Sequence, residues 1–311
     1  MAVFYDITKL PAFHNAVITI GTFDGVHLGH RAILGELKRL AAERHGESVV
    51  LTFEPHPRKL LFPDQPLKLL TPLSKKVSLI MEAGIQHVVV IPFTKEFANL
   101  SATEYIEQFL VKNFHPDCII IGYDHKFGHD RTGDISLLKQ YAGKCHYHVD
   151  EIPAQLIDAA AVSSTKIRKA LNDGRVAEAT HMLGRPYSVE GTVIAGAQRG
   201  RTIGYPTANI RPSDPEQLVP ANGVYAVRVR HNETWLNGML NIGFNPTVTT
   251  EKIRHIEVNL FDFNADIYNE TLEVAFISRL RDEKKFGSLD ELKQALHNDK
   301  ETATQILTPN P

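Results

Sequence analysis

The sequence predicts an α/β protein with two parts: an N-terminal doubly wound parallel sheet, and a C-terminal small antiparallel β-barrel with a terminal helix. Up to about residue 150, short strands that are apolar throughout alternate with helical patterns. After Gly184-Arg185-Pro186, helical patterns vanish until residue 288, and short strands separated by turns replace them. We therefore expect two domains, residues 1–183 and residues 184–311.

The first half should contain five strands and four helices in alternation. Strands without polar alternation are buried on both faces, which is typical of a parallel sheet covered by helices. Ligands of such sheets bind beyond the carboxyl ends of the strands, so the turns at 21–25, 54–57 and 122–134 are expected to converge on one site. The strands are expected at 17–20, 48–53, 87–93, 118–122 and 146–152, and the helices at 30–45, 73–83, 101–114 and 132–142.

The second half should be a barrel closed by a helix. Two helices, one beginning near residue 163 and one over 173–183, precede the Gly184-Arg185-Pro186 break. Short strands joined by turns then predict antiparallel pairing. These strands are expected at 187–194, 224–230, 235–242, 255–263 and 271–277, and the terminal helix at 288–306.

Composition narrows the class of protein. The chain of 311 residues is 43% hydrophobic and 23% charged, which is ordinary for a globular protein. Its net charge of -2 argues against a general nucleic-acid binder. Cys118 and Cys145 cannot form a disulfide framework, and Cys118 lies in a strand pattern typical of a core. No stretch reads as a membrane span or a signal peptide, so a cytoplasmic protein is expected, with its oligomeric state open.

The first candidate site is the turn after the strand at 17–20. The sequence Gly21-Thr22-Phe23-Asp24-Gly25-Val26-His27-Leu28-Gly29-His30 leads from that strand into a helix. Two histidines three apart share a helix face, and a helix N-terminus offers free N–H groups and a positive dipole. This combination suits a polyphosphate. It matches neither the dinucleotide nor the P-loop motif, and zinc would need a third ligand. A tight turn with two surface histidines is the alternative.

Two further segments carry polar groups suited to a ligand. Ser163-Ser164-Thr165-Lys166-Ile167-Arg168 could form an anion clamp at a helix N-terminus, or Ser163 or Ser164 could merely cap the helix. The loop at 122–134 combines glycines, charges and Phe127, which favours a ligand loop over a solvated one.

In the second half the informative segment is 196–209, which contains Gly204-Tyr205-Pro206-Thr207-Ala208-Asn209. Glycines leave backbone N–H groups open for phosphates. Thr207 and Asn209 carry the hard oxygen donors that Mg²⁺ prefers. The alternative is a proline turn that leads into a strand.

Together these segments resemble a known family. The Thr22–His30 and Ser163–Arg168 segments resemble the nucleotidyltransferase domain of the bacterial bifunctional riboflavin kinase/FAD synthetases, and Gly204–Asn209 resembles the riboflavin kinase signature. The H-x-G-H turn alone is shared by many nucleotidyltransferases, but the resemblance covers nearly the whole chain. It implies phosphorylation of riboflavin to FMN by the C-terminal domain and adenylylation of FMN to FAD by the N-terminal domain, with ATP and Mg²⁺.

The resemblance also implies roles for individual residues. Glu257 would take the proton from the riboflavin 5′-hydroxyl, although strand alternation alone would allow a solvated outer position. His27 and His30 would stabilise charge on the phosphates, and Asp24 would position the nucleotide or a metal. The adenylyltransferase ATP set is Gly21, Thr22, Phe23, Asp24, Gly29, Ser164, Thr165 and Arg168; the flavin or nucleotide loop set is Gly122, Asp124 and Phe127; the kinase set is Gly196, Arg199, Gly200, Arg201, Gly204, Pro206, Arg281 and Glu283; the metal ligands are Thr207 and Asn209.

The sequence departs from the family at a few positions. Ala197 and Asn259 replace the Asp and His that many members carry, and neither change removes a proposed catalytic group. Ser74-Lys75-Lys76 replaces a more usual acid–lysine pair, and no role is assigned there.

Two other functions compete with this interpretation. A different nucleotidyltransferase with an accessory barrel would have no need of Thr207 and Asn209. A non-catalytic flavin-binding regulator would be expected to have lost His27, His30 or Glu257, and all three are present.

Overall fold

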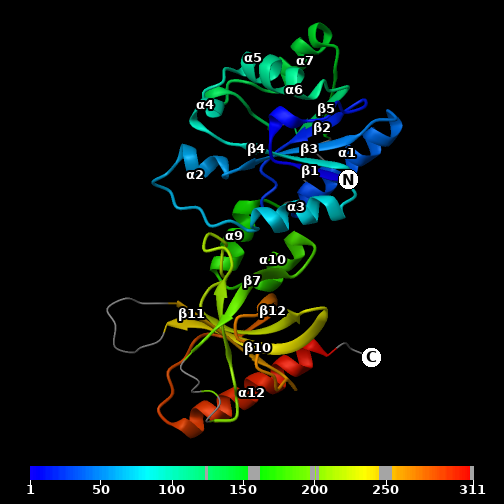
Figure 1. Ribbon diagram of the computed structural model, residues 1–311. Helices are drawn as coiled ribbons and strands as arrows, with labels where there is room; N and C mark the ends of the chain where they lie inside the picture. Colours follow the sequence, from blue (N-terminus) through cyan, green and yellow to red (C-terminus); the bar gives the residue numbers. More distant parts are fainter. Residues whose placement is uncertain (123–124, 153–161, 197–199, 201–202, 245–253, 309–311) are drawn as a thin grey trace. The chain divides into compact units, whose positions relative to one another are not determined.

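The computed structural model describes residues 1–122, 125–152, 162–196, 200, 203–244 and 254–308 (Figure 1). The chain forms two compact units, Met1–Ser164 and Thr165–Pro311. Each unit is described below by itself. The domain boundary near residue 184 remains a prediction from the sequence.

The first unit is built on a parallel sheet, as predicted. Its strand order is β1-β4-β3-β2-β5-β6, and every pair of neighbours is parallel. The strand β1 was not predicted, because three residues are too few to show a pattern. The strands are β1 (Ala2–Phe4), β2 (Val17–Ile20), β3 (Ser48–Glu54), β4 (His87–Pro92), β5 (Cys118–Gly122) and β6 (His148–Ile152).

Helices cover both faces of this sheet (Figure 1). Along β2, Ile18 and Ile20 pack into one apolar cluster, which includes residues 102–114, while Val17 packs into the other with α1 and α3. Cys118 is buried, as predicted. The helices are α1 (Leu28–Glu43), α2 (Pro57–Leu61), α3 (Leu73–Glu82), α4 (Lys95–Ala98), α5 (Ala102–Glu104), α6 (Lys112–Phe114) and α7 (Ile135–Cys145), with a π-helical stretch at Tyr105–Val111 and short 3₁₀ turns at Ile7–Lys9 and His129–Arg131.

The second unit is a closed antiparallel barrel with a terminal helix, as predicted. The strand order around the barrel is β10-β11-β8-β7-β12-β9. The strand β8 was not predicted as such, because it follows directly on the proline turn at Pro206. The strands are β7 (Tyr187–Ile194), β8 (Ala208–Pro212), β9 (Gly223–His231), β10 (Thr234–Phe244), β11 (Arg254–Leu260) and β12 (Thr271–Arg281).

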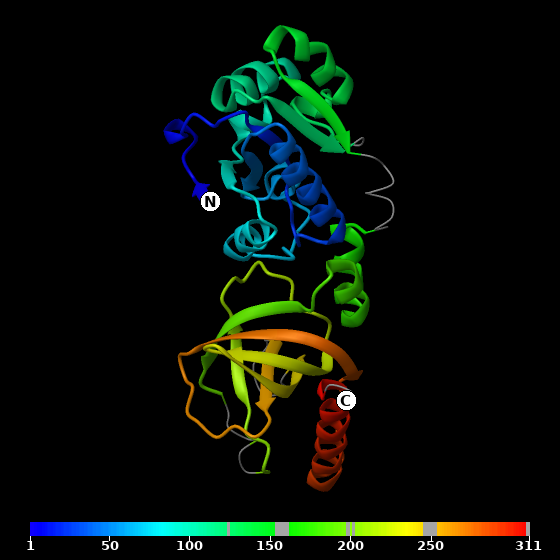
Figure 2. The same cartoon turned by 90° about the vertical axis from the view of Figure 1, so that its right-hand side faces the viewer.

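Two of the helices described in the second unit pack on the barrel strands. The helix α9 (Ser164–Asn172) begins at the last residue of the first unit, and α10 (Val176–Leu183) contacts β7 and β12. The terminal helix α12 (Leu289–Leu307) lies along the barrel, and its Ala303 and Leu307 bury against Met239 (Figure 2). Among the helices of the described ranges, none is long and apolar enough to cross a membrane.

Candidate active sites

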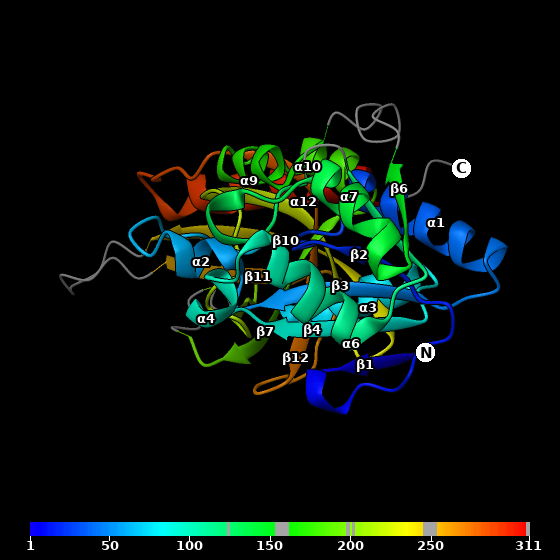
Figure 3. The same ribbon diagram turned by 90° about the horizontal axis from the view of Figure 1, so that it is seen from above.

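The three turns expected to converge do begin at the same edge of the sheet. The strands β3, β2 and β5 are adjacent and parallel, so their carboxyl ends lie side by side. The strands β2 and β3 can be followed in Figure 3. The Gly21 turn follows β2, and the Glu54–Pro57 loop follows β3. This edge is where ligands of doubly wound sheets bind.

The two histidines of the Gly21 turn form a stacked pair. The rings of His27 and His30 have centroids 3.7 Å apart and an interplanar angle of 17°. His27 precedes α1 as its N-cap, and its Nδ1 accepts a hydrogen bond from the His30 backbone N–H at 3.3 Å. The pair therefore arises from capping, whereas the sequence suggested two positions on one helix face. Because Nδ1 of His27 is an acceptor, the neutral ring carries its proton on Nε2.

Gly29 explains the spacing of the H-x-G-H motif. A Cβ atom at this position would lie 3.3 Å from the His27 ring, tighter than most such contacts. The glycine therefore lets the capping ring lie flat over the first turn of α1.

His30 is held in its neutral form. Its Nδ1 is buried and has no hydrogen-bond partner in the described part of the chain. The centroid of the Phe23 ring lies 5.1 Å from the centroid of the His30 ring. Burial first, and then the neighbouring His27 and Lys76, hold the pKa of His30 well below 6.5. A neutral imidazole has one N–H group, which can donate a hydrogen bond to a phosphate.

Asp24 serves the structure of the turn. Its carboxylate is buried and accepts hydrogen bonds from the backbone N–H groups of Leu70 at 3.0 Å and Thr71 at 3.1 Å. The Thr71 hydroxyl accepts in turn from the Gly25 N–H at 3.1 Å. Asp24 thus ties the Gly21 turn to the segment that begins α3. Its expected role towards nucleotide or metal stays a prediction.

Ser164 joins the far end of the unit to this turn. Its hydroxyl donates to the Asp24 backbone oxygen at 2.9 Å, which brings the serine segment and the histidine turn together, as the sequence suggested. Thr165 and Arg168 follow on α9 and belong to the second unit. Gly21 and Thr22 are anchored through their backbones to Leu51 and Thr52 of β3.

The loop after β5 contributes less to an open site than expected. The Phe127 ring is buried and stacks on Tyr105 at 5.0 Å, while the Phe127 backbone pairs with Gly133. The ring therefore belongs to the hydrophobic core. Gly122 ends β5, and Asp124 lies outside the described residues.

The barrel brings Glu257 and the proposed metal ligands together. On β11, Glu257 is the direct cross-strand partner of Asn209 on β8, and Thr207 lies two residues before Asn209. Directly opposite residues of an antiparallel pair point to the same face with Cβ atoms about 5 Å apart. All three side chains are half-buried, and none makes a hydrogen bond within the described part of the barrel. On the other side of Glu257, its β10 partner is Asn241, which the sequence analysis did not single out.

Three residues contribute to holding the signature turn in place. Asn259 is buried, and its amide donates to the Pro206 oxygen at 2.7 Å. Gly196 lies against the Asn209 amide, so closely that a Cβ atom would collide with it. Gly200 accepts hydrogen bonds from the N–H groups of Ile203 and Tyr205. Gly204 lies in the same turn, while Arg199 and Arg201 lie outside the described residues.

The end of β12 is fixed to the terminal helix. The Arg281 guanidinium binds the buried carboxylate of Asp299 through Nε at 2.9 Å and Nη2 at 2.7 Å. The guanidinium also donates through Nη1 to the Asp282 backbone oxygen at 3.0 Å, and its central carbon lies 5.5 Å from the centroid of the Phe286 ring. Glu283 lies over Gly243 of β10, where any side chain would displace it.

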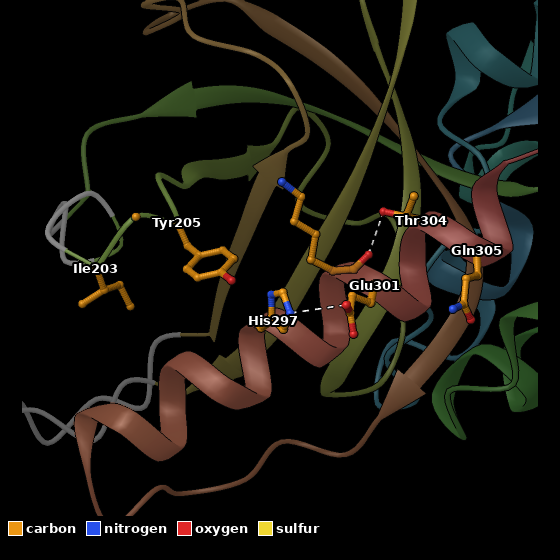
Figure 4. Close-up of a pocket in the computed structure, with 8 residues that line it drawn as sticks. Ile203, Tyr205, His297, Glu301, Thr304 and Gln305 are labelled. Carbon is orange, nitrogen blue, oxygen red and sulfur yellow. Dashed lines mark hydrogen bonds and ion pairs between the residues drawn. The ribbon is translucent and has the colours of Figure 1, made fainter.

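A pocket of about 620 Å³ lies between the signature turn and α12 (Figure 4). This volume is ordinary for a small-molecule site. Ile203 and Tyr205 line one side, and His297 and Glu301, which form an ion pair at 3.3 Å, line the other. The sequence predicted α12 only as a terminal helix and did not single out the α12 residues that line this pocket.

Taken together, the fold and the two sites define a two-domain transferase that acts on phosphates. One domain presents two stacked imidazoles and a hydroxyl beside the Gly21 turn, and the other presents a carboxylate beside two side chains that carry oxygen donors.

Comparison with known proteins identifies the family. The family model described as FAD synthetase matches residues 10–166, and the one described as riboflavin kinase matches residues 183–307. Bifunctional riboflavin kinase/FMN adenylyltransferases are similar over nearly the full length: 38% identity in Listeria monocytogenes, covering 92% of this chain and 91% of the relative, and 37% in Escherichia coli K12, covering 97% and 96%.

A solved structure agrees in fold. The crystal structure described as a macrolide-efflux protein from Streptococcus pneumoniae aligns with a TM-score of 0.87 and 33% identity, over 97% of this chain and 98% of its own. The chain belongs to the bifunctional riboflavin kinase/FMN adenylyltransferase family, with a FAD synthetase domain before a riboflavin kinase domain. The resemblance stated from the motifs is confirmed.

Proposed function

We propose that this chain converts riboflavin to FMN in its barrel and FMN to FAD in its first domain, using ATP in both steps, with residues 1–183 and 184–311 as the two functional parts. The observation that supports it is the presence of one separate polar cluster in each matched domain. The pair of stacked imidazoles suits charge stabilisation, and the carboxylate of Glu257, which makes no hydrogen bond among the described residues, suits proton removal.

In the kinase step, Glu257 takes the proton of the riboflavin 5′-hydroxyl while that oxygen bonds to the γ-phosphorus of ATP. The bond from the γ-phosphorus to the bridging oxygen breaks, and FMN and ADP are formed. Glu257 suits this role because no hydrogen bond within the described residues occupies its carboxylate. The glycines of the signature turn give their N–H groups to the phosphates, and the proposed contacts from Arg281 and Glu283 hold the flavin side.

Thr207 and Asn209 would hold Mg²⁺ in this domain. The donor set fits, because both residues offer oxygen atoms that no hydrogen bond occupies in the described chain, beside the carboxylate of Glu257. When bound with ATP, Mg²⁺ neutralises the phosphate oxygens.

In the adenylyltransferase step, an oxygen of the FMN phosphate bonds to the α-phosphorus of ATP, and pyrophosphate leaves. The attacking phosphate is already ionised, so the domain needs no strong base. The Nε2–H of His27 and the neutral ring of His30 donate to the phosphates as charge develops. Ser164, Thr165 and Arg168 are the residues that we propose to hold the triphosphate.

The test separates the two steps in one protein. Purified chain is incubated with ATP and Mg²⁺ and either riboflavin or FMN, and the flavins are separated by chromatography. We expect Glu257→Gln to slow FMN formation by about 100-fold or more and to leave FAD formation from FMN unchanged. His30→Ala should do the reverse, by about 100-fold.

A matched control is Glu190→Gln, which changes an exposed glutamate on β7 of the same barrel and should affect neither step. Loss of both activities in either site variant, with the fold intact, would refute two independent sites. No conversion by the unmodified chain would refute the proposed function.

A further inference from the structure

Lys76 is a buried, positively charged residue at a position where the packing of the fold does not require a charge. It lies on α3 and is 5% exposed, on the same helix face as the fully buried Ile80 four residues on. An apolar residue would fill this position at a lower free-energy cost, because burying a charge requires compensation.

The compensation within the protein is incomplete. The Lys76 Nζ donates to the Phe53 backbone oxygen at 3.2 Å, and over the described residues no carboxylate lies within ion-pair distance. Burial lowers the pKa of Lys76, while the more distant Glu54 and Asp24 act against that change. The carboxylate of Asp24 is already shared by two backbone N–H groups. An ammonium group with three donors therefore lacks a direct anionic partner.

The position of the Lys76 ammonium group indicates where an anionic partner would have to lie. Phe53 is the next-to-last residue of β3, so Nζ reaches the carboxyl edge of the sheet. His30 lies close enough for the Lys76 charge to contribute to its lowered pKa. Lys76 thus approaches, from α3, the edge at which α1 presents the stacked imidazoles.

We propose that Lys76 supplies a buried positive charge to the polyphosphate of ATP, and to the pyrophosphate product, in the first domain. This inference rests on the proposed adenylyltransferase function and adds a binding residue to it. Asp24 positions the helix that carries the charge, because it holds Leu70 and Thr71 just before α3.

The experiment measures pyrophosphate binding by calorimetry in the presence of Mg²⁺, and FMN binding by flavin fluorescence, on the full chain. Lys76→Met removes the charge at nearly constant volume. We expect it to weaken pyrophosphate binding and raise the KM for ATP by about 10- to 100-fold, as for a lost charged hydrogen bond, with FMN affinity within about twofold. Lys76→Arg keeps the charge and should retain most of the pyrophosphate affinity.

Lys75→Met is the matched control, because it makes the same change one residue earlier on α3 at a half-buried position. It should leave pyrophosphate binding unchanged. Unaltered pyrophosphate affinity in folded Lys76→Met would overturn the proposal, as would an equal loss of pyrophosphate and FMN binding in both Lys76 variants. Failure of the unmodified chain to form FAD would instead refute the proposed function.

Discussion

The carboxylate of Asp24 offers the sharpest test of how the first site is held together. It is 3% exposed and accepts from two backbone N–H groups, at Leu70 and Thr71. Asp24→Ala leaves both groups buried without an acceptor, at a cost of about 1–3 kcal/mol each, partly relieved by water. A loss of about 3 kcal/mol should lower the Tm of the first domain by about 6–12 °C.

The assay is thermal unfolding followed by circular dichroism, with kinase activity as an internal check on the barrel. Asp24→Asn keeps Oδ1, which accepts from both N–H groups, so its Tm should fall much less. If Asp24 also positions nucleotide or metal, the Asp24→Asn protein should remain folded but lose its ability to form FAD. Asp64→Ala, at an exposed acid in the same domain, is the control. An Asp24→Ala protein that melts within about 2 °C of that control would refute the reasoning.

Three further predictions concern other contacts. The pKa of His30 is lowered in the folded state, so the unfolded chain binds more protons than the folded chain below pH 6.5. The first domain should therefore lose stability as the pH falls from about 7 to about 5. Melting curves of His30→Gln should show a weaker pH dependence than those of the unmodified chain. Gly196→Ala should slow FMN formation by about tenfold or more, since its Cβ atom would displace the Asn209 amide, with FAD formation from FMN unchanged in the same flavin assay. Asp299→Ala should destabilise the barrel by about 3 kcal/mol in urea unfolding, because Arg281 loses its ion pair, and an unchanged midpoint would contradict this.

The architecture was predictable because its signals are local. Apolar strands such as β2 and β5 and the capping box at Ser101 and Glu104 need only neighbouring residues, and both appear where expected. The ends of elements were less predictable. The strand β12 runs to Arg281 through two register shifts with β9, and such irregularities break the alternation by which a strand is recognised in sequence.

The site was predictable only where a motif names its residues. The histidine turn and the signature segment could be found in this way, but Lys76 and Asn241 could not. A lysine on an amphipathic helix normally points to solvent, and only the packing of α3 against the sheet shows that Lys76 is buried. Asn241 gains its position from the pairing of β10 with β11, and a sequence does not state strand register.

The two sites differ in how their polar groups are satisfied, and the difference matches the chemistry proposed for each. In the first domain, His27 caps α1 and Ser164 binds the Asp24 backbone, so the groups are fixed before any ligand arrives. Transfer of AMP from ATP to a phosphate that is already a nucleophile needs no base, and fixed donors such as these stabilise the charge that develops on the phosphates. In the barrel, Glu257 and Asn209 face each other with no hydrogen bond among described residues. A hydroxyl nucleophile requires an open base and open metal ligands, because proton removal and charge neutralisation take place at those atoms.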